Sequence, residues 1–273
     1  VPPGTDPFDA EMLFIVAAGP LSGTLSPGSG RVEVISKSPL SGLFGDTNAG
    51  EDFGPMLHWA GYDALIVQGK AETPVYIWID DDNVEIRDAR HLWGRSHIEA
   101  INMVKKEIGD PEITTLSVGP AAERKVAYAA VYSGYRSVAG LPGLGSVMGA
   151  KNLKLIAVRG TKGVEIADPS GFEKACKEAF SKILSSRIYP TYAEEGVLGL
   201  VNTLFNQIGV LPVRNFQEAG GLPPEKLENV GYKGFSKHKI KNLACFGCPL
   251  HCKHFVHIKT GPYAGIKMKG VEY

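Results

Sequence analysis

The sequence predicts an α+β protein, in which a β-rich amino-terminal domain is followed by the beginning of an α-helical domain. Short apolar or alternating runs between glycine-rich turns, a pattern typical of strands, fill residues 11 to about 160. Helical spacing of apolar residues takes over after Gly163. A chain of 273 residues is long enough for one or two domains. We therefore expect domains at residues 1–164 and 165–273.

The strands of the first domain are expected in close succession. They are predicted at residues 12–17, 31–36, 64–68, 75–79, 84–87, 113–118, 126–132 and 153–159. The fourth and fifth flank the turn-forming run Asp81-Asp82-Asn83, so this pair is predicted to form a β-hairpin.

Three helices are expected. Ser96 and Glu99 have the spacing of a capping box, and apolar residues then recur at helical spacing as far as Ile108. In the second domain, a helix is predicted to open at residues 168–170 and to end near residue 185. Another is predicted over residues 192–208.

The charge and hydropathy patterns exclude several classes of protein. The 29 basic and 29 acidic residues balance, so no net charge points to nucleic acid or to a membrane surface. No apolar run approaches the roughly 18 residues of a membrane span. The cysteines are too clustered for a disulfide framework and suit a reducing compartment, so a cytoplasmic protein is expected. The chain starts without Met and ends without a terminal signal, which suggests a fragment of a longer protein.

The most informative motif is a cysteine cluster. Cys245, Cys248 and Cys252 form a C-x2-C-x3-C run, a spacing at which three thiolates can share one metal centre. Enzymes that cleave S-adenosylmethionine use the reverse order of spacings, so that class is disfavoured. His251 and His254 flank the last cysteine, and spacing alone leaves zinc and iron–sulfur equally open. The other cysteine, Cys176, is expected to be a buried thiol on the apolar face of a helix.

Glycine-rich loops are the second signal. Three of them lie in the β-rich half, at residues 19–31, 42–50 and 139–149. Glycine allows backbone N–H groups to approach an anion closely, so such loops can cradle phosphates, although one loop alone is more often a set of tight turns. The glycine order fits neither a dinucleotide-binding fingerprint nor a P-loop.

Taken in order, these motifs closely resemble the aldehyde:ferredoxin oxidoreductase family of tungsten enzymes. The resemblance is collinear along nearly the whole chain and includes the three cysteines. Its runs include Ala17-Ala18-Gly19-Pro20-Leu21-Ser22-Gly23-Thr24, Ser38-Pro39-Leu40-Ser41-Gly42, Asn48-Ala49-Gly50, Ala60-Gly61-Tyr62-Asp63-Ala64, Leu92-Trp93-Gly94 and Gly143-Leu144-Gly145-Ser146-Val147-Met148-Gly149-Ala150-Lys151-Asn152-Leu153-Lys154. Members of the family are roughly twice this length.

The resemblance implies a cofactor set. In the family, the amino-terminal domain is a pair of β-sheets beneath two pterin dithiolenes that hold one tungsten, or molybdenum, and a [4Fe-4S] cluster lies nearby. Cys245, Cys248 and Cys252 would bind the cluster, with the fourth cysteine beyond Tyr273. Zinc then becomes the less favoured metal. The catalytic residues are also expected beyond Tyr273, so Glu272 is a neighbour of the active centre rather than a member of it.

The resemblance also assigns roles near the pterins. Arg31 would lie between pterin and cluster, where a permanently charged guanidinium can serve both. Asn48 and the segment Ser137-Val138-Ala139 would offer backbone carbonyls to a Mg²⁺ that bridges the pterin phosphates. Ala49, Gly50 and Gly140 complete the expected cofactor-binding set. Leu141-Pro142 replaces an arginine and glycine of many relatives, and proline removes one backbone donor from that loop.

The implied activity is oxidation of a small aldehyde to a carboxylic acid, with electrons leaving through the cluster to ferredoxin. Residues 233–269 hold eight lysines, four histidines and no acidic residue, which suits an acidic redox partner. A solvated basic face explains the lysines equally well, and no nucleic-acid motif accompanies them. The protein is expected to act as a homo-oligomer or with electron-transfer subunits. The alternatives are a non-catalytic iron–sulfur or structural subunit of the same fold, and a zinc-stabilised module.

Overall fold

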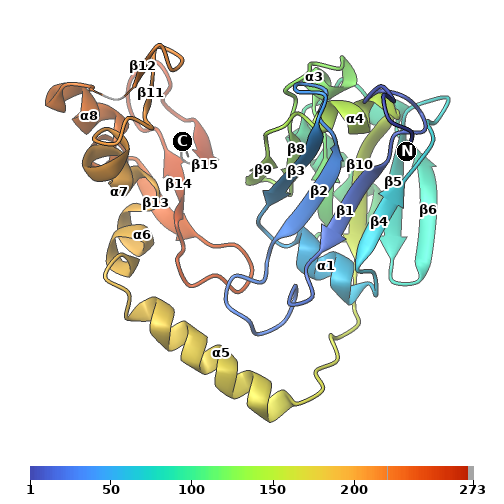
Figure 1. Ribbon diagram of the computed structural model, residues 1–273, viewed down its shortest axis with the longest axis horizontal. Coiled ribbons are helices and arrows are strands. Elements are labelled where there is room, and N and C mark those ends of the chain that lie inside the picture. Colours follow the sequence, from blue (N-terminus) through green and yellow to red (C-terminus); the bar gives the residue numbers. More distant parts are fainter. Residues whose placement is uncertain (220, 270–273) are drawn as a thin grey trace. The chain divides into compact units, whose positions relative to one another are not determined.

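The structure is a computed structural model that describes residues 1–219 and 221–269 (Figure 1). The chain forms two compact units, and the α+β class expected from the sequence is confirmed. The first unit contains residues 1–169 together with Cys245–Gly247. The second begins at Ser170 and contains the rest of the chain. No helix in the described part of the chain combines the length and apolar character that a membrane span requires.

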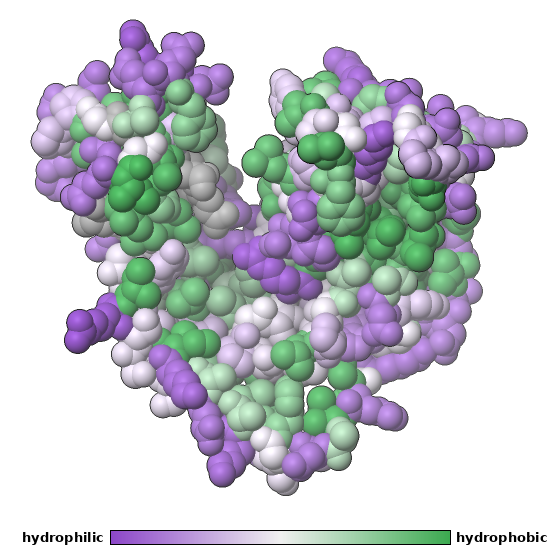
Figure 2. Space-filling view, viewed as in Figure 1, coloured by the Kyte–Doolittle hydropathy of each residue, from purple (hydrophilic) through white to green (hydrophobic). Residues whose placement is uncertain are grey.

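A four-stranded antiparallel sheet forms one side of the first unit. Its strands, in spatial order, are β3 (Phe44–Ala49), β2 (Val32–Lys37), β1 (Phe14–Ala18) and β4 (Ala64–Val67). One face enters the core. The other carries Ile15, Ile35 and Ile66 side by side in register, and Figure 2 shows apolar side chains gathered over these strands.

A six-stranded mixed sheet forms the other side. Its order is β6 (Asn83–Asp88), β5 (Val75–Asp80), β10 (Leu153–Arg159), β7 (Thr114–Ser117), β8 (Val131–Ser133) and β9 (Ser137–Ala139). Only β5 and β10 run parallel. The predicted hairpin is present as β5 and β6.

One apolar core joins the two sheets, because inward residues of both, such as Val34 and Ile156, belong to the same buried cluster. A second cluster lies under α2 on the other face of the larger sheet. The predicted capping box is formed: Ser96 Oγ accepts from Glu99 N at 3.3 Å, and Glu99 Oε2 accepts from Ser96 N at 2.9 Å. The helices of this unit are α1 (Phe53–Trp59), η1 (Arg90–Leu92), α2 (His97–Ile108), α3 (Pro120–Glu123) and α4 (Gly145–Ala150).

The structure differs from the sequence prediction in two glycine-rich stretches. Residues 42–50, expected as a loop, contain β3, because pairing with β2 outweighs the low strand propensity of Gly, Asp and Asn. Residues 145–149, also expected as a loop, lie in α4. The strand predicted at residues 126–132 is reduced to β8, since residues 127–130 pack their carbonyls against Gly143 and Gly145 instead of pairing.

The second unit is helical and also contains two antiparallel sheets that were not foreseen. One pairs β11 with β12, and in the other β14 lies between β13 and β15. Its helix α5 confirms the helix expected to end near residue 185, and Cys176 is buried on it. The helix predicted over 192–208 is broken at Gly196, which adopts a positive φ of 61°. The elements are α5 (Pro169–Leu184), α6 (Tyr189–Glu195), α7 (Leu198–Leu200), a π-helical turn η2 (Val201–Phe205), β11 (Pro212–Val213), β12 (Glu218–Ala219), α8 (Pro224–Val230), α9 (Tyr232–Ser236), β13 (Lys239–Leu243), β14 (Lys253–His257) and β15 (Lys267–Lys269).

Candidate functional site

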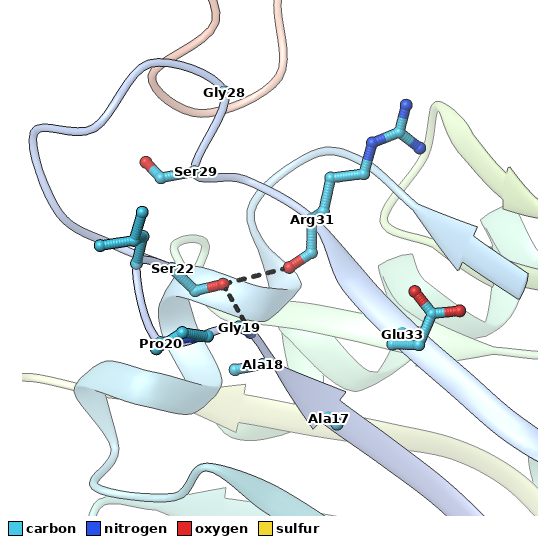
Figure 3. Close-up of a pocket in the computed structure, with 10 residues that line it drawn as sticks. Ala17, Ala18, Gly19, Pro20, Ser22, Gly28, Ser29, Arg31 and Glu33 are labelled. Carbon is cyan, nitrogen blue, oxygen red and sulfur yellow. Dashed lines mark hydrogen bonds between the residues drawn. The ribbon is translucent and has the colours of Figure 1, made fainter.

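The loop before β2 is held by a buried serine. Ser22 Oγ accepts a hydrogen bond from Gly19 N at 3.0 Å and donates to Arg31 O at 3.3 Å (Figure 3). The ring of His58 on α1 donates from Nδ1 to Ser22 O at 2.8 Å. These bonds join both ends of the first glycine-rich loop to α1, and they fix the backbone from which the Arg31 side chain departs.

Arg31 and Asn48, both expected at the cofactor, are in direct contact. The exposed Arg31 guanidinium donates from Nη1 to Asn48 Oδ1. Asn48 lies opposite Glu33 in the register of β2 and β3, so the three side chains share the outward face of the smaller sheet.

A pocket of about 320 Å³ opens beside Arg31. Its wall is made by residues of the first glycine-rich loop and of the adjoining strands, namely Ala17, Ala18, Gly19, Pro20, Leu21, Ser22, Gly28, Ser29, Arg31 and Glu33. Burial raises the pKa of the Glu33 carboxyl, nearby Asp46 raises it further, and Arg31 and Asn48 oppose the change. Glu33 was not among the site residues expected from the sequence, because a glutamate at an alternating strand position reads as an ordinary surface residue.

The two segments expected to provide backbone carbonyls are neighbours. Strand β3, which ends at Ala49, contacts β9, and the Gly50 carbonyl accepts from Ser133 Oγ at 2.8 Å. A Cβ added at Gly50 would lie 3.4 Å from Ser137 Oγ. Ser137 and Ala139 are buried, Val138 is exposed, and Gly140 follows at the strand end. The structure therefore brings residues 48–50 and 137–140 together within one unit.

Cys245 lies at this same place in the first unit. A Cβ added at Gly50 would stand 2.3 Å from Cys245 Sγ, so only glycine allows the thiol to approach the backbone this closely. Phe246 N donates to Glu51 O at 3.4 Å, and Gly28 N donates to Gly247 O at 2.9 Å. Residues 245–247 thus pack on both the first glycine-rich loop and the end of β3.

Aromatic packing and an ion pair support this arrangement. The rings of Trp59 and Phe246 meet edge to face with centroids 5.3 Å apart. Glu51 is buried, and its Oε1 accepts from Arg136 Nε at 2.8 Å, which ties the residue after Gly50 to the residue before β9. Sequence reasoning missed Phe246, Glu51 and Arg136, since no local pattern reveals contacts between segments so far apart in the chain.

Pro142, where the sequence departs from the family pattern, has a packing role. Its ring lies over Gly45 of β3, where an added Cβ would be 2.5 Å from the proline Cγ. Its carbonyl accepts from Ser38 Oγ at 2.8 Å. Pro142 therefore joins the third glycine-rich loop to the smaller sheet through apolar contact and one hydrogen bond.

Cys248 and Cys252 belong to the second unit, where both are half-buried and free of disulfides. The carbonyl of Cys252 lies against Gly196, at which an added Cβ would approach within 2.2 Å. His254 is buried and its Nε2 donates to Glu194 O at 3.2 Å, so this nitrogen is not available to a metal. Within neither unit, over the described residues, are three His, Cys, Asp or Glu side chains gathered into a metal-binding group.

The first unit can nevertheless accommodate a polar, anionic cofactor. It presents a guanidinium, a buried carboxylate oxygen without a partner among the described residues, and adjacent backbone segments kept open by Gly50. The guanidinium suits an anion, the carboxylate suits N–H donors, and backbone carbonyls are ligands that hard cations prefer.

Comparison with known families gives two matches. Residues 1–160 match the model described as "Aldehyde ferredoxin oxidoreductase, N-terminal domain". Residues 174–273 match the model described as "Aldehyde ferredoxin oxidoreductase, domains 2 & 3".

Individual proteins show the same similarity. A tungsten-containing aldehyde ferredoxin oxidoreductase from Pyrococcus horikoshii is 44% identical over 92% of this chain. The WOR-like subunit of an aliphatic sulfonate oxidoreductase from Pyrococcus furiosus is 33% identical over 95% of it. The chain spans 41% and 43% of the lengths of these relatives. Among solved structures, the active-site complex BamBC of benzoyl coenzyme A reductase, in complex with 1,5-dienoyl-CoA, superposes on 99% of the chain with a TM-score of 0.79 and 29% identity, and the match covers 42% of that structure's chain.

Proposed function

This chain belongs to the aldehyde ferredoxin oxidoreductase family, and on that premise we propose that it forms part of a tungsten–pterin enzyme that oxidises an aldehyde to a carboxylic acid. Its electrons would leave through a [4Fe-4S] cluster to ferredoxin. The observation that carries the proposal is the meeting of Arg31, Gly50, Ser137 and Cys245 at one place in the first unit. Since the chain spans about two fifths of its relatives, the substrate-binding residues are assigned to the remainder of the protein.

The first unit would hold the pterins. We assign them to the domain of residues 1–164, with Arg31 on the pterin and the backbone carbonyls of Asn48 and of residues 137–139 on a bridging Mg²⁺. Ala49, Gly50 and Gly140 would keep the backbone open around these carbonyls. The hydrogen bond from Arg31 to the Asn48 side chain supports this assignment, because it fixes the guanidinium beside the segment that carries the Asn48 carbonyl.

Three thiolates would bind the cluster. Cys245 and Gly50 are in contact, so this ligand would lie close to the pterin-binding backbone, and Cys248 and Cys252 are the other two proposed ligands. The bound groups would supply Lewis acidity, uptake of two electrons and their onward transfer one at a time. The chain itself would fix geometry: Ser22 positions Arg31, and Gly50 admits Cys245.

A ferredoxin or similar acidic protein is the proposed partner. The lysines of residues 233–269 are not equally available for such a partner, because Lys253 is buried and Lys239 pairs with Glu194 at 3.1 Å. The exposed members of the set are Lys233, which pairs with Glu228 at 2.7 Å, and Lys237, Lys241, Lys259 and Lys267. These positive charges would raise the rate of association with an acidic partner, and added salt would reduce that effect.

Elemental analysis of the full-length gene product, purified without oxygen, tests the proposal. We expect about one tungsten and about four irons per chain, and aldehyde-dependent reduction of ferredoxin. Iron without tungsten or pterin would favour a non-catalytic electron-transfer subunit, and zinc alone would contradict the redox function.

Cysteine variants provide the matched control. Cys248→Ala is expected to remove the cluster iron and its reduced-state spectrum, because a cluster ligand is lost. Cys176→Ala changes a cysteine that is buried on α5, and it is expected to retain the wild-type iron content. Equal iron in the two variants would contradict the ligand assignment.

A further inference from the structure

Glu33 has a carboxylate oxygen that no described protein group serves. The side chain is half-buried on β2, and Oε1 is shielded from solvent without accepting a hydrogen bond from any residue in the described ranges. Burying a polar atom in this way is costly, because folding removes its water and replaces it with nothing. In a native protein such an atom needs an explanation, and a bound group that donates a hydrogen bond is one.

The neighbouring strands do not supply that donor. Glu33 lies opposite Ala17 on β1 and opposite Asn48 on β3. Ala17 has no polar side-chain atom, and the Asn48 amide oxygen, which accepts from Arg31, cannot donate. A side-chain hydrogen bond from Asn48 lowers the pKa of the Glu33 carboxyl, yet Oε1 itself has no hydrogen-bond partner within the described ranges. The missing donor is therefore expected from the pocket side.

The pocket beside Glu33 combines an acceptor with a donor. Glu33 and Arg31 are the two ionisable residues in its wall, and their side chains rise from the same side of β2 (Figure 3). An ionised carboxylate only accepts hydrogen bonds, and a guanidinium only donates them. A complementary ligand presents N–H donors and an acceptor atom along one edge. The small residues of the wall, such as Ala17 and Gly19, leave room for a flat ring.

We propose that Glu33 binds the 2-amino-4-oxopyrimidine edge of a pterin through Oε1 and so fixes the orientation of the ring. The 2-amino group and the adjacent ring N–H are paired donors that suit a carboxylate, and the 4-oxo group suits Arg31. The pocket volume of about 320 Å³ lies within the range of small-molecule sites. This inference rests on the proposed function and adds a residue that the family resemblance does not assign.

Glu33→Gln, compared with Asp46→Asn in the anaerobically purified full-length protein, tests the proposal. Gln preserves the size of the side chain and replaces an acceptor oxygen with an amino group. Asp46 is an exposed carboxylate on β3 that does not line the pocket, so its variant controls for loss of charge. The readout is the rate at which pterin leaves the protein, followed by fluorescence of its oxidised form in the filtrate. We expect release roughly 10 to 100 times faster from Glu33→Gln, the range for loss of a hydrogen bond to a charged group, and wild-type release from Asp46→Asn.

The outcomes separate this inference from the proposed function. Wild-type release from a Glu33→Gln protein with an unchanged circular dichroism spectrum overturns the role of Glu33 and leaves the proposed function standing. Wild-type protein that contains no pterin overturns the proposed function itself. If Glu33→Gln does not fold, Glu33→Asp is used in its place. A natively folded Glu33→Asp protein that releases pterin faster than the wild type supports pterin binding by Glu33, and release at the wild-type rate overturns it.

Discussion

Gly50 illustrates how a single residue type determines the site. A methyl group at this position would lie 2.3 Å from Cys245 Sγ and 3.4 Å from Ser137 Oγ, so Gly50→Ala is expected to displace the segment that carries Cys245. Overpacking of this kind costs about 1 to 3 kcal/mol. Urea unfolding should show that loss, and the Cys245 thiol should react faster with an alkylating reagent. Gly119→Ala is the control, since nothing lies within 4 Å of its added Cβ; equal stability and thiol reactivity in the two variants would contradict the contact.

His97 makes stability depend on pH. Burial, and secondarily the nearby Lys154, lower the pKa of His97 from its ordinary value of 6.5 in the folded protein, where the ring stacks on Tyr132 at 3.9 Å. The unfolded chain therefore takes up a proton near pH 6.5 that the folded chain does not take up. The free energy of unfolding is expected to fall as the pH drops below 6.5. Urea titrations at pH 7.5 and pH 5.5 measure this decrease in the free energy of unfolding. The decrease should be smaller in His97→Gln than in the wild type, and an identical decrease would contradict the prediction.

At the scale of elements, a buried ion pair joins β10 to α3. Lys154 Nζ lies 2.5 Å from Glu123 Oε1 and also donates to Arg95 O at 2.7 Å, with Lys154 fully buried. Lys154→Met leaves the Glu123 carboxylate buried without its partner, which costs about 3 to 5 kcal/mol. The double variant Lys154→Met/Glu123→Leu leaves neither charge, so its unfolding free energy should exceed that of Lys154→Met. A double variant less stable than the single one would contradict this account.

The elements differ in how far sequence could predict them. Helix α2 is marked locally by Ser96 and Glu99, and β5 and β6 by a turn between two alternating runs, so both were predicted. Strand β3 has no such mark, because Gly45, Asp46 and Asn48 are poor strand formers and its extended form depends on pairing with β2. The helix predicted over residues 192–208 includes Gly196, whose positive φ ends α6 and has no mark in the local sequence.

At the scale of the whole molecule, the sequence predicted the α+β class, with a β-rich part followed by a helical part. Both were predictable because the spacing of hydrophobic residues and the glycine content change along the chain. It also nominated Arg31, Asn48 and Cys245, which lie in the first unit, and their roles stay predictions. What it could not predict are the contacts between distant segments: the buried oxygen of Glu33, the pair of Glu51 with Arg136, and the packing of residues 245–247 on the first unit. These arise from tertiary structure and have no local signature.

The packing of Phe246 on Trp59 and Glu51 has a consequence for synthesis of the protein on the ribosome. The first unit reaches residue 169, but its last piece is made about 80 residues later. At about 5 to 20 residues per second, this delay is roughly 4 to 16 seconds. During that interval the indole of Trp59 and the backbone around Gly30 and Gly50 lack the segment that later covers them. The nascent chain therefore presents an uncovered apolar surface at the candidate site, where a chaperone could bind before residues 245–247 emerge.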